Sequence, residues 1–221
     1  AYEVLRSLVG SEMCIRDSYQ SGVIYLYRLL FLLYAESRNL LPLDNPTYYE
    51  HFSLAHLLDS LEQSQMDKQN PGGTLLADEL AELFGKLNCG QEEAGIAAYN
   101  GGLFRPGGIP GLEAPLVDDP QRRLPNSALG AALRALAYAD GERVDYYDLR
   151  VQQLGTIYEG LLEHHLEWKD GRLALVYDRG ERKALGGFFT PDEVVSYIVQ
   201  QTLEPLVQQS PGRYRSVEEI M

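Results

Sequence analysis

The chain has 221 residues, of which 45% are hydrophobic and 23% charged, an ordinary composition for a globular protein with room for a sizeable core. The formal net charge of −13 repels phosphates, which argues against a main DNA-binding face on this chain, although a local basic cluster stays open. The two cysteines, Cys14 and Cys89, form no Cys-x-x-Cys pair, which argues against a disulfide framework or a thiolate zinc site and favours a reducing cytoplasm.

The most apolar run covers residues 23–35 and is too short to cross a bilayer. Arg28 and three tyrosines interrupt it, so we expect a helix buried in a protein core and no contact with a membrane. Residues 1–10 lack both a continuous apolar core and a basic leader, which argues against a signal peptide.

Residues 11–18, Ser-Glu-Met-Cys-Ile-Arg-Asp-Ser, resemble a translation of the mosaic-end sequence that transposase-based library kits add to DNA fragments. The bases AG-ATG-TGT-ATA-AGA-GAC-AG encode the end of Glu12, then Met13 to Asp17, then the start of Ser18. A natural turn with a lone cysteine is the alternative. We expect residues 1–18 to be a sequencing-adapter or misassembly segment, and no functional argument is built on them.

From residue 19 to about residue 39, apolar residues occupy nearly all faces of a helical pattern, as in a helix buried inside a bundle. Two proline-containing turns between residues 41 and 46 are expected to end it. Further helices are expected over Tyr48–Met66 and from Leu75 to about Leu87, with a break at Asn70-Pro71-Gly72-Gly73 between them.

Residues 88–125 are rich in Gly and Pro and predict a long loop with little regular structure. Inside it, Tyr99-Asn100-Gly101-Gly102-Leu103-Phe104 permits a tight turn with positive φ, and its Tyr, Leu and Phe can pin that turn to a core. We interpret the hexapeptide as a structural anchor, with a functional role as the alternative.

Helical patterns return at Asn126–Ala139 and at about Leu149–Glu167, the second with one strong apolar stripe. Residues 166–177 predict a β-hairpin, because Asp170-Gly171 is a favoured two-residue turn and both arms are rich in β-formers. A last long helix is expected from Pro191, with a kink or an end before Pro205. Together these elements predict a mainly α fold with one small β-hairpin.

Few residues stand in a pattern that indicates chemistry. His164 and His165 are adjacent on a predicted helix and so point in different directions, whereas two zinc ligands on one helix face stand three or four residues apart. We therefore expect one packed and one exposed histidine. The sequence contains no serine elbow and no phosphate-cradling glycine loop, and it predicts neither a catalytic residue nor a metal site in this chain.

The stretch before the last helix, Gly186-Gly187-Phe188-Phe189-Thr190-Pro191-Asp192-Glu193, holds more than a helix start requires. Thr190 as N-cap, Pro191 at the first helical position and Glu193 in a capping box all follow from stability. The stability of the helix does not require the two glycines and two aromatics that precede them. Glycines let backbone approach a ligand, and aromatics beside a helix N-terminus can line a pocket for a flat ring and an anionic group. A ligand site and a merely well-capped helix are the two interpretations.

Behind this start, apolar residues at helical spacing predict a face that packs against a core. They are Val194, Val195, Ile198, Val199, Leu203 and Leu206.

Four motifs follow one another along the chain: Tyr27–Glu36 (YRLLFLLYAE), Tyr99–Phe104 (YNGGLF), Leu154–Glu163 (LGTIYEGLLE) and Gly187–Pro191 (GFFTP). In this order they resemble the amino-terminal part of adenine-specific DNA methyltransferases of the fused type IIG restriction–modification kind, and related phage-defence methyltransferases. The resemblance covers most of residues 19–221. None of the motifs is decisive alone, and their common order makes the signal fairly specific.

In such enzymes a helical connector precedes the methyltransferase, and the aromatic-Thr-Pro element lies beside the S-adenosylmethionine pocket, near the amino acid end of the cofactor. By position, the resemblance implies that Thr190 contacts the cofactor, with Phe189 and Pro191 as neighbours. The family often has Tyr where Phe189 stands, so any contact made by that hydroxyl is missing here. The whole enzyme would transfer a methyl group to adenine N6, on a base flipped out of double-stranded DNA.

The resemblance also implies a division of the chain. Residues 19–148 would form the helical connector domain with the loop 88–125, and residues 149–221 would start the methyltransferase domain with a helix, a hairpin and a cofactor-side helix. The family's Asp-Pro-x-x-Gly-Ser-Gly and Asn-Pro-Pro-Tyr/Phe motifs do not occur in this sequence. We therefore expect a mainly α fragment that carries the first helix of a truncated α/β methyltransferase domain and does not methylate DNA alone. Its partners would be the rest of its own polypeptide and, through downstream domains, double-stranded DNA.

Two other functions stay open. The acidic surface and the long Gly/Pro loop also suit a non-enzymatic helical interaction module. A methyltransferase for RNA or a small molecule could share the same cofactor element, and a basic target-recognition region encoded downstream would argue against it.

Overall fold

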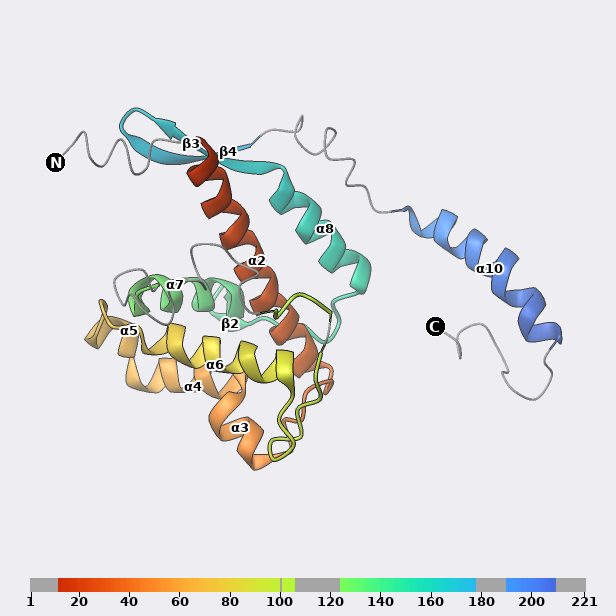
Figure 1. Cartoon of the computed structure of the whole chain (residues 1–221), viewed down its shortest axis with the longest axis horizontal. Helices are drawn as coiled ribbons and strands as arrows, with labels where there is room; N and C mark the ends of the chain where they lie inside the picture. The colour runs from red at the N-terminus through yellow and green to blue at the C-terminus, as the bar shows by residue number, and fades with distance from the viewer. Residues whose placement is uncertain (1–11, 100, 106–123, 178–189, 210–221) are drawn as a thin grey trace. The chain divides into compact units, whose positions relative to one another are not determined.

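The fold is known from a computed structural model (Figure 1). It describes residues 12–99, 101–105, 124–177 and 190–209. The chain divides into two compact units: unit 1 is residues 1–151 with 164–177, and unit 2 is residues 152–163 with 178–221. The described residues are mainly helical with two small antiparallel hairpins, which confirms the predicted mainly α class. A search of the same residues for a helix long and apolar enough to span a membrane finds none.

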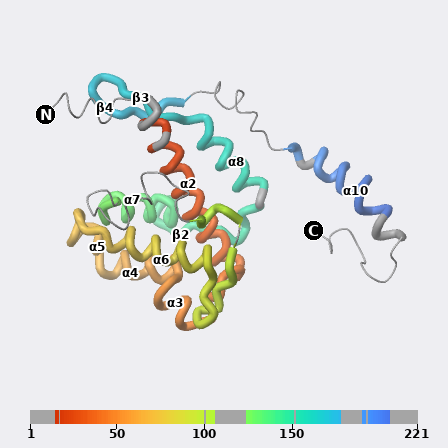
Figure 2. Tube along the Cα trace, viewed as in Figure 1, coloured from red at the N-terminus to blue at the C-terminus, as the bar shows by residue number. Residues whose placement is uncertain are grey.

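The helices of unit 1 are α2 (Glu12–Ser37), α3 (Pro46–Phe52), α4 (Leu54–Ser64), α5 (Met66–Gln69), α6 (Leu75–Cys89) and α7 (Asn126–Ala137). Helix α7 packs against α4, α5 and α6, and α2 packs against α4, so one apolar core lies between them (Figure 2). Leucines dominate this core, and six of them are 0% exposed: Leu32, Leu54, Leu61, Leu76, Leu80 and Leu87.

Helix α2 confirms the buried helix predicted from residue 19, and it also includes residues 12–18. A helical conformation is compatible with any origin of those residues. The adapter origin of residues 1–18 therefore stays a prediction.

The single helix predicted over Tyr48–Met66 is wrong. Asn45 accepts hydrogen bonds from the backbone N–H of Thr47 at 2.9 Å and of Tyr48, so the expected turn at Asn45-Pro46 instead opens α3 with Pro46 in its first turn. Ser53, at φ −74° and ψ 139°, then separates α3 from α4. Its Oγ accepts from His56 N–H at 3.0 Å. Side-chain capping thus overrides the apolar periodicity that runs through both helices.

The predicted hairpin is confirmed as β3 (His164–Lys169) paired with β4 (Arg172–Tyr177). Asp170 and Gly171 have φ of 52° and 78°, the left-handed backbone that a type I′ turn needs at both central positions. The predicted helix over Leu149–Glu167 is wrong at its C-terminal end. Helix α8 (Val151–Leu162) stops before His164, because the residues that follow pair with β4 as far as Tyr177.

A second hairpin was not predicted. Strands β1 (Tyr138–Ala139) and β2 (Glu142–Arg143) pair across Asp140-Gly141, whose φ angles are 52° and 83°. The same Asp-Gly signal was available here in the sequence. The apolar spacing of α7 extends through Ala139 in the sequence and therefore predicts helix where β1 begins.

In unit 2 the described elements are α8 and α10 (Asp192–Gln209). Helix α10 continues past Pro205, so of the predicted kink or end before this proline the end is wrong, and the kink stays a prediction. The apolar face predicted on α10 exists, but it is not buried among the described residues: Val194 is 45% exposed, Val195 40% and Ile198 51%. The sequence identified the amphipathic helix correctly, and its partner is not among the described elements.

Candidate functional site

The predicted cofactor element is described from Thr190 onward, and Phe189 lies outside the described residues. Thr190 and Pro191 are both exposed and directly precede α10. The carbonyl of Pro191 accepts hydrogen bonds from the N–H groups of Val194 at 2.9 Å and Val195 at 3.0 Å. The first helical bonds are therefore accepted by Pro191, one residue later than a Thr190 N-cap predicts.

The start of α10 combines positive and negative charge. The first N–H groups of a helix have no partner within it and carry partial positive charge, which suits a carboxylate. The exposed Glu193 adds a negative charge at the same end, which suits an ammonium group. An amino acid zwitterion combines both charges, so a helix end with this charge arrangement can bind one.

The first two of the four motifs lie in unit 1, and they pack on one another. Arg28 is fully buried, and its Nε donates a hydrogen bond to the carbonyl oxygen of Leu103 at 2.7 Å. Its Nη2 donates to the carbonyl oxygen of Arg105 at 3.2 Å. The guanidinium also lies 5.0 Å from the ring centre of Phe84 and 5.8 Å from that of Phe104. Arg28, which the sequence places as a charged residue within a core helix, thus holds a loop that lies 75 residues further along the chain.

Aromatic contacts complete this junction. The ring of Phe31 lies edge-on to those of Tyr99 and Phe104, with centroid distances of 6.5 Å and 5.5 Å. The Tyr99 hydroxyl donates to the carbonyl oxygen of Leu40 at 3.0 Å. Phe104 is buried in the core, and Gly102 has the positive φ, +80°, that the sequence predicted. The described residues Tyr99 and Phe104 therefore anchor this turn to the core as predicted, while Asn100 lies outside the described residues.

Glu36, the last residue of the first motif, holds the start of α4. Its Oε1 accepts hydrogen bonds from the Tyr48 hydroxyl at 2.8 Å and from Leu54 N–H at 2.7 Å. Its Oε2 accepts from Ala55 N–H at 2.9 Å. Burial raises the pKa of this carboxyl above its ordinary value, although these three hydrogen bonds oppose the rise. Glu36 is therefore a cap supplied from another helix, a structural role.

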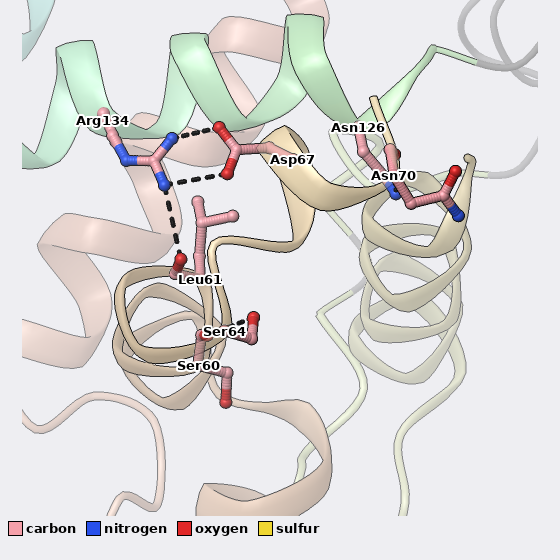
Figure 3. Close-up of polar contacts among 7 residues, drawn as sticks. All are labelled: Ser60, Leu61, Ser64, Asp67, Asn70, Asn126 and Arg134. Atoms are coloured by element: carbon pink, nitrogen blue, oxygen red, sulfur yellow. Dashed lines mark hydrogen bonds and ion pairs between the residues drawn. The ribbon is translucent and has the colours of Figure 1, made fainter. Parts of the chain in front are cut away.

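A third polar junction fixes α5 to α7 (Figure 3). Arg134 donates to both carboxylate oxygens of Asp67 and, through Nη2, to the carbonyl oxygen of Leu61 at 3.3 Å. The hydrogen bond from Arg134 lowers the pKa of Asp67, even though burial opposes this. Asn126, fully buried, donates to the carbonyl oxygen of Asn70 at 3.1 Å. These contacts are also structural.

The two histidines lie on strand β3, so the prediction that they share a helix is wrong. They still point in different directions, because successive side chains of a strand face opposite sides. The His164 ring contacts that of Tyr177 at 5.1 Å, and His165 Nε2 lies 3.0 Å from Glu167 Oε1. Both are partly buried, not one packed and one exposed. Within the described ranges, no group of three or more His, Cys, Asp or Glu side chains could hold a metal ion.

Comparison with known proteins adds a distant relative. The chain is similar to a restriction–modification protein. It is 24% identical over 198 residues to the Methanocaldococcus jannaschii protein named "Putative type II restriction enzyme and methyltransferase RM.MjaORFECS2P". The alignment covers 86% of this chain and 15% of that protein, so the chain spans a small part of its relative's length. No family model matches the chain, and no solved structure matches it.

Proposed function

We propose that the chain is part of a site-specific DNA methyltransferase of a restriction–modification or phage-defence system, which uses S-adenosylmethionine to methylate adenine N6. The observation that carries this proposal is the alignment over 86% of the chain with a protein named as a restriction enzyme and methyltransferase. The four motifs support the same class. The packing of the first two motifs through Arg28 and Leu103 gives them a common structural purpose.

The start of α10 is the proposed cofactor contact. Thr190 would offer its hydroxyl to the amino acid end of S-adenosylmethionine, with Phe189 and Pro191 as neighbours. The free N–H groups of the first helical turn would bind the cofactor carboxylate. The carboxylate of Glu193 would bind its ammonium group. When bound, S-adenosylmethionine supplies the methyl group, and these residues only bind and orient it.

The proposal also assigns the parts of the chain. Residues 19–148 would be the connector and residues 149–221 the start of the methyltransferase domain, while residues 1–18 would be foreign. The relative is much longer than the aligned part, which supports a chain that works within a larger polypeptide. Because neither of the family's catalytic and cofactor-loop motifs occurs in these 221 residues, the chain alone is proposed to be inactive.

An unbroken long-read sequence of the source locus tests this proposal. We expect the bases that encode Glu12 to Ser18 to be absent from it, and Asp-Pro-x-x-Gly-Ser-Gly and Asn-Pro-Pro-Tyr/Phe motifs to follow in frame. A frame that closes soon after Met221 without either motif would overturn the methyltransferase assignment.

A non-enzymatic helical interaction module is the second candidate. The observation that favours it is the exposed apolar face of α10, where Val194, Val195, Tyr197 and Ile198 are each at least 40% exposed. In a methyltransferase this face would be covered by the rest of the catalytic domain. The same locus sequence separates the two candidates, because only the first requires the downstream motifs.

A further inference from the structure

The hairpin β3–β4 has a feature that its own stability does not explain. Its register places Lys169 directly opposite Arg172, on either side of the turn, and both are exposed. Like charges at directly opposed positions destabilise a strand pair. Among the ion pairs of the described residues, none involves Lys169 or Arg172.

An exposed aromatic residue stands beside these cations. Trp168 is 51% exposed and pairs with Leu173, which is 47% exposed. Side chains alternate along a strand, so these two share one face of the ribbon while Lys169 and Arg172 share the other. The apolar face continues along β4 with Leu175 and Tyr177, which are 61% and 51% exposed.

Two acidic residues lie near the turn, so the formal charges of residues 167–172 sum to zero, but neither acid is ion-paired with a cation of the tip among the described residues. Glu167 Oε1 lies 3.0 Å from His165 Nε2, a contact along the same strand and away from the tip. Asp170 occupies a turn position with φ 52°, where Asp and Asn are among the few residues that tolerate this backbone. In a chain with 32 acidic and 19 basic residues, the strand register places two cations side by side at this turn.

We propose that the tip of this hairpin contacts double-stranded DNA. Lys169 and Arg172 would bind backbone phosphates, and Trp168 and Leu173 would lie against sugars or base edges. A two-stranded β-ribbon fits the major groove of B-DNA, where thymine methyl groups also offer apolar contacts. A protein surface could cover the apolar face, but it would gain nothing from two neighbouring cations unless it also carried carboxylates. The proposal rests on the proposed function only in choosing DNA among polyanions.

Trp168 is the sole tryptophan of the chain, so its fluorescence reports on the tip directly. The experiment titrates the 221-residue chain with a 20-base-pair duplex at low salt and follows Trp168 emission. We expect quenching that weakens as salt rises. Each phosphate contact contributes a slope of about −0.9 to log K against log salt. The double variant Lys169→Gln/Arg172→Gln should therefore bind at least fivefold more weakly, with a slope flatter by about one to two units.

The matched control is Lys68→Gln/Arg143→Gln, which removes the same charge from two exposed positions outside β3–β4. The affinity of this control variant for the duplex should be close to that of the parent chain. Asp170→Asn preserves the turn type while removing a negative charge, so it should bind more tightly. Far-ultraviolet circular dichroism of each variant verifies that it is folded.

Three results would overturn the proposal. The duplex could leave Trp168 emission unchanged, or both double variants could weaken binding equally. Trp168 emission could also shift with protein concentration alone while the chain sediments as a dimer, which would assign the apolar face to a second copy. These results are independent of the locus sequence, which tests the proposed function separately.

Discussion

The Nε atom of Arg28 in α2 donates a hydrogen bond to the carbonyl oxygen of Leu103 at 2.7 Å, across 75 positions of sequence. This contact joins the motif Tyr27–Glu36 to the motif Tyr99–Phe104. It explains why a charge stands inside the most apolar run of the chain: the loop brings unpaired carbonyl groups to the core, and a guanidinium can satisfy several of them at once.

Replacing Arg28 by Met should strongly destabilise unit 1. The variant leaves the carbonyls of Leu103 and Arg105 without this donor and removes the cation from the rings of Phe84 and Phe104. Leaving a buried acceptor without its donor costs about 1–3 kcal/mol for each carbonyl. The free energy of unfolding from urea denaturation measures the effect.

The control for this substitution is Arg143→Gln. Its ion pair with Asp59 is 3.0 Å long but largely exposed, so its loss should cost about 1 kcal/mol or less. Equal losses in the two variants would show that Arg28 does not hold the loop.

Glu36→Gln should change how stability depends on pH. Burial raises the folded-state pKa of Glu36 above 4.5, so the folded chain holds this proton more tightly than the unfolded chain. The contribution of Glu36 to stability is therefore full below about pH 4.5 and declines as pH rises through the folded pKa. The difference in unfolding free energy between the parent and Glu36→Gln should fall across that window. A difference that rises with pH would show that the three hydrogen bonds outweigh burial.

Two glycine substitutions should change the free energy of unfolding in opposite directions. A Cβ at Gly130 in α7 would lie 2.6 Å from the Cβ of Asp67, which Arg134 holds in place, so Gly130→Ala should cost about 1–3 kcal/mol. A Cβ at Gly85 in α6 meets nothing within 4 Å, so Gly85→Ala should stabilise the helix by about 0.5–1 kcal/mol. Thermal unfolding of both variants shows whether each substitution raises or lowers the stability of the parent chain. A stabilising Gly130→Ala would mean that α5 can move away from α7.

Thr190→Ala should weaken cofactor binding in the longer polypeptide that the proposal expects. Losing one hydrogen bond to a charged group costs about 1.5 kcal/mol, or roughly tenfold in the KM for S-adenosylmethionine. The control is Thr202→Ala on the same helix, because the Thr202 hydroxyl donates only to carbonyls of α10, at 2.8 Å from that of Ile198. Equal KM values for the parent and Thr190→Ala would remove Thr190 from the site. Methyl transfer by the purified 221-residue chain would contradict its proposed inactivity.

Local sequence rules predicted part of this structure because the deciding interactions are close in sequence. The Asp170-Gly171 turn is such a case, since two residues with positive φ set the hairpin register by themselves. The buried helix α2 is another, because leucines on nearly all faces leave no solvated side. The exposed face of α10 was predicted as an apolar face, but whether it is buried depends on an element that is not local to it.

The helical class, the β3–β4 hairpin and the order of the four motifs can be predicted from the amino-acid sequence, because periodicity and turn chemistry depend on neighbouring residues. The roles of the buried charges become visible only in the folded chain. Arg28 holds a loop and Glu36 caps a helix that begins 18 residues later, and no local pattern distinguishes these roles from solvated charges. The same holds for the facing cations Lys169 and Arg172, because charge repulsion becomes visible only when the strand register places them opposite each other.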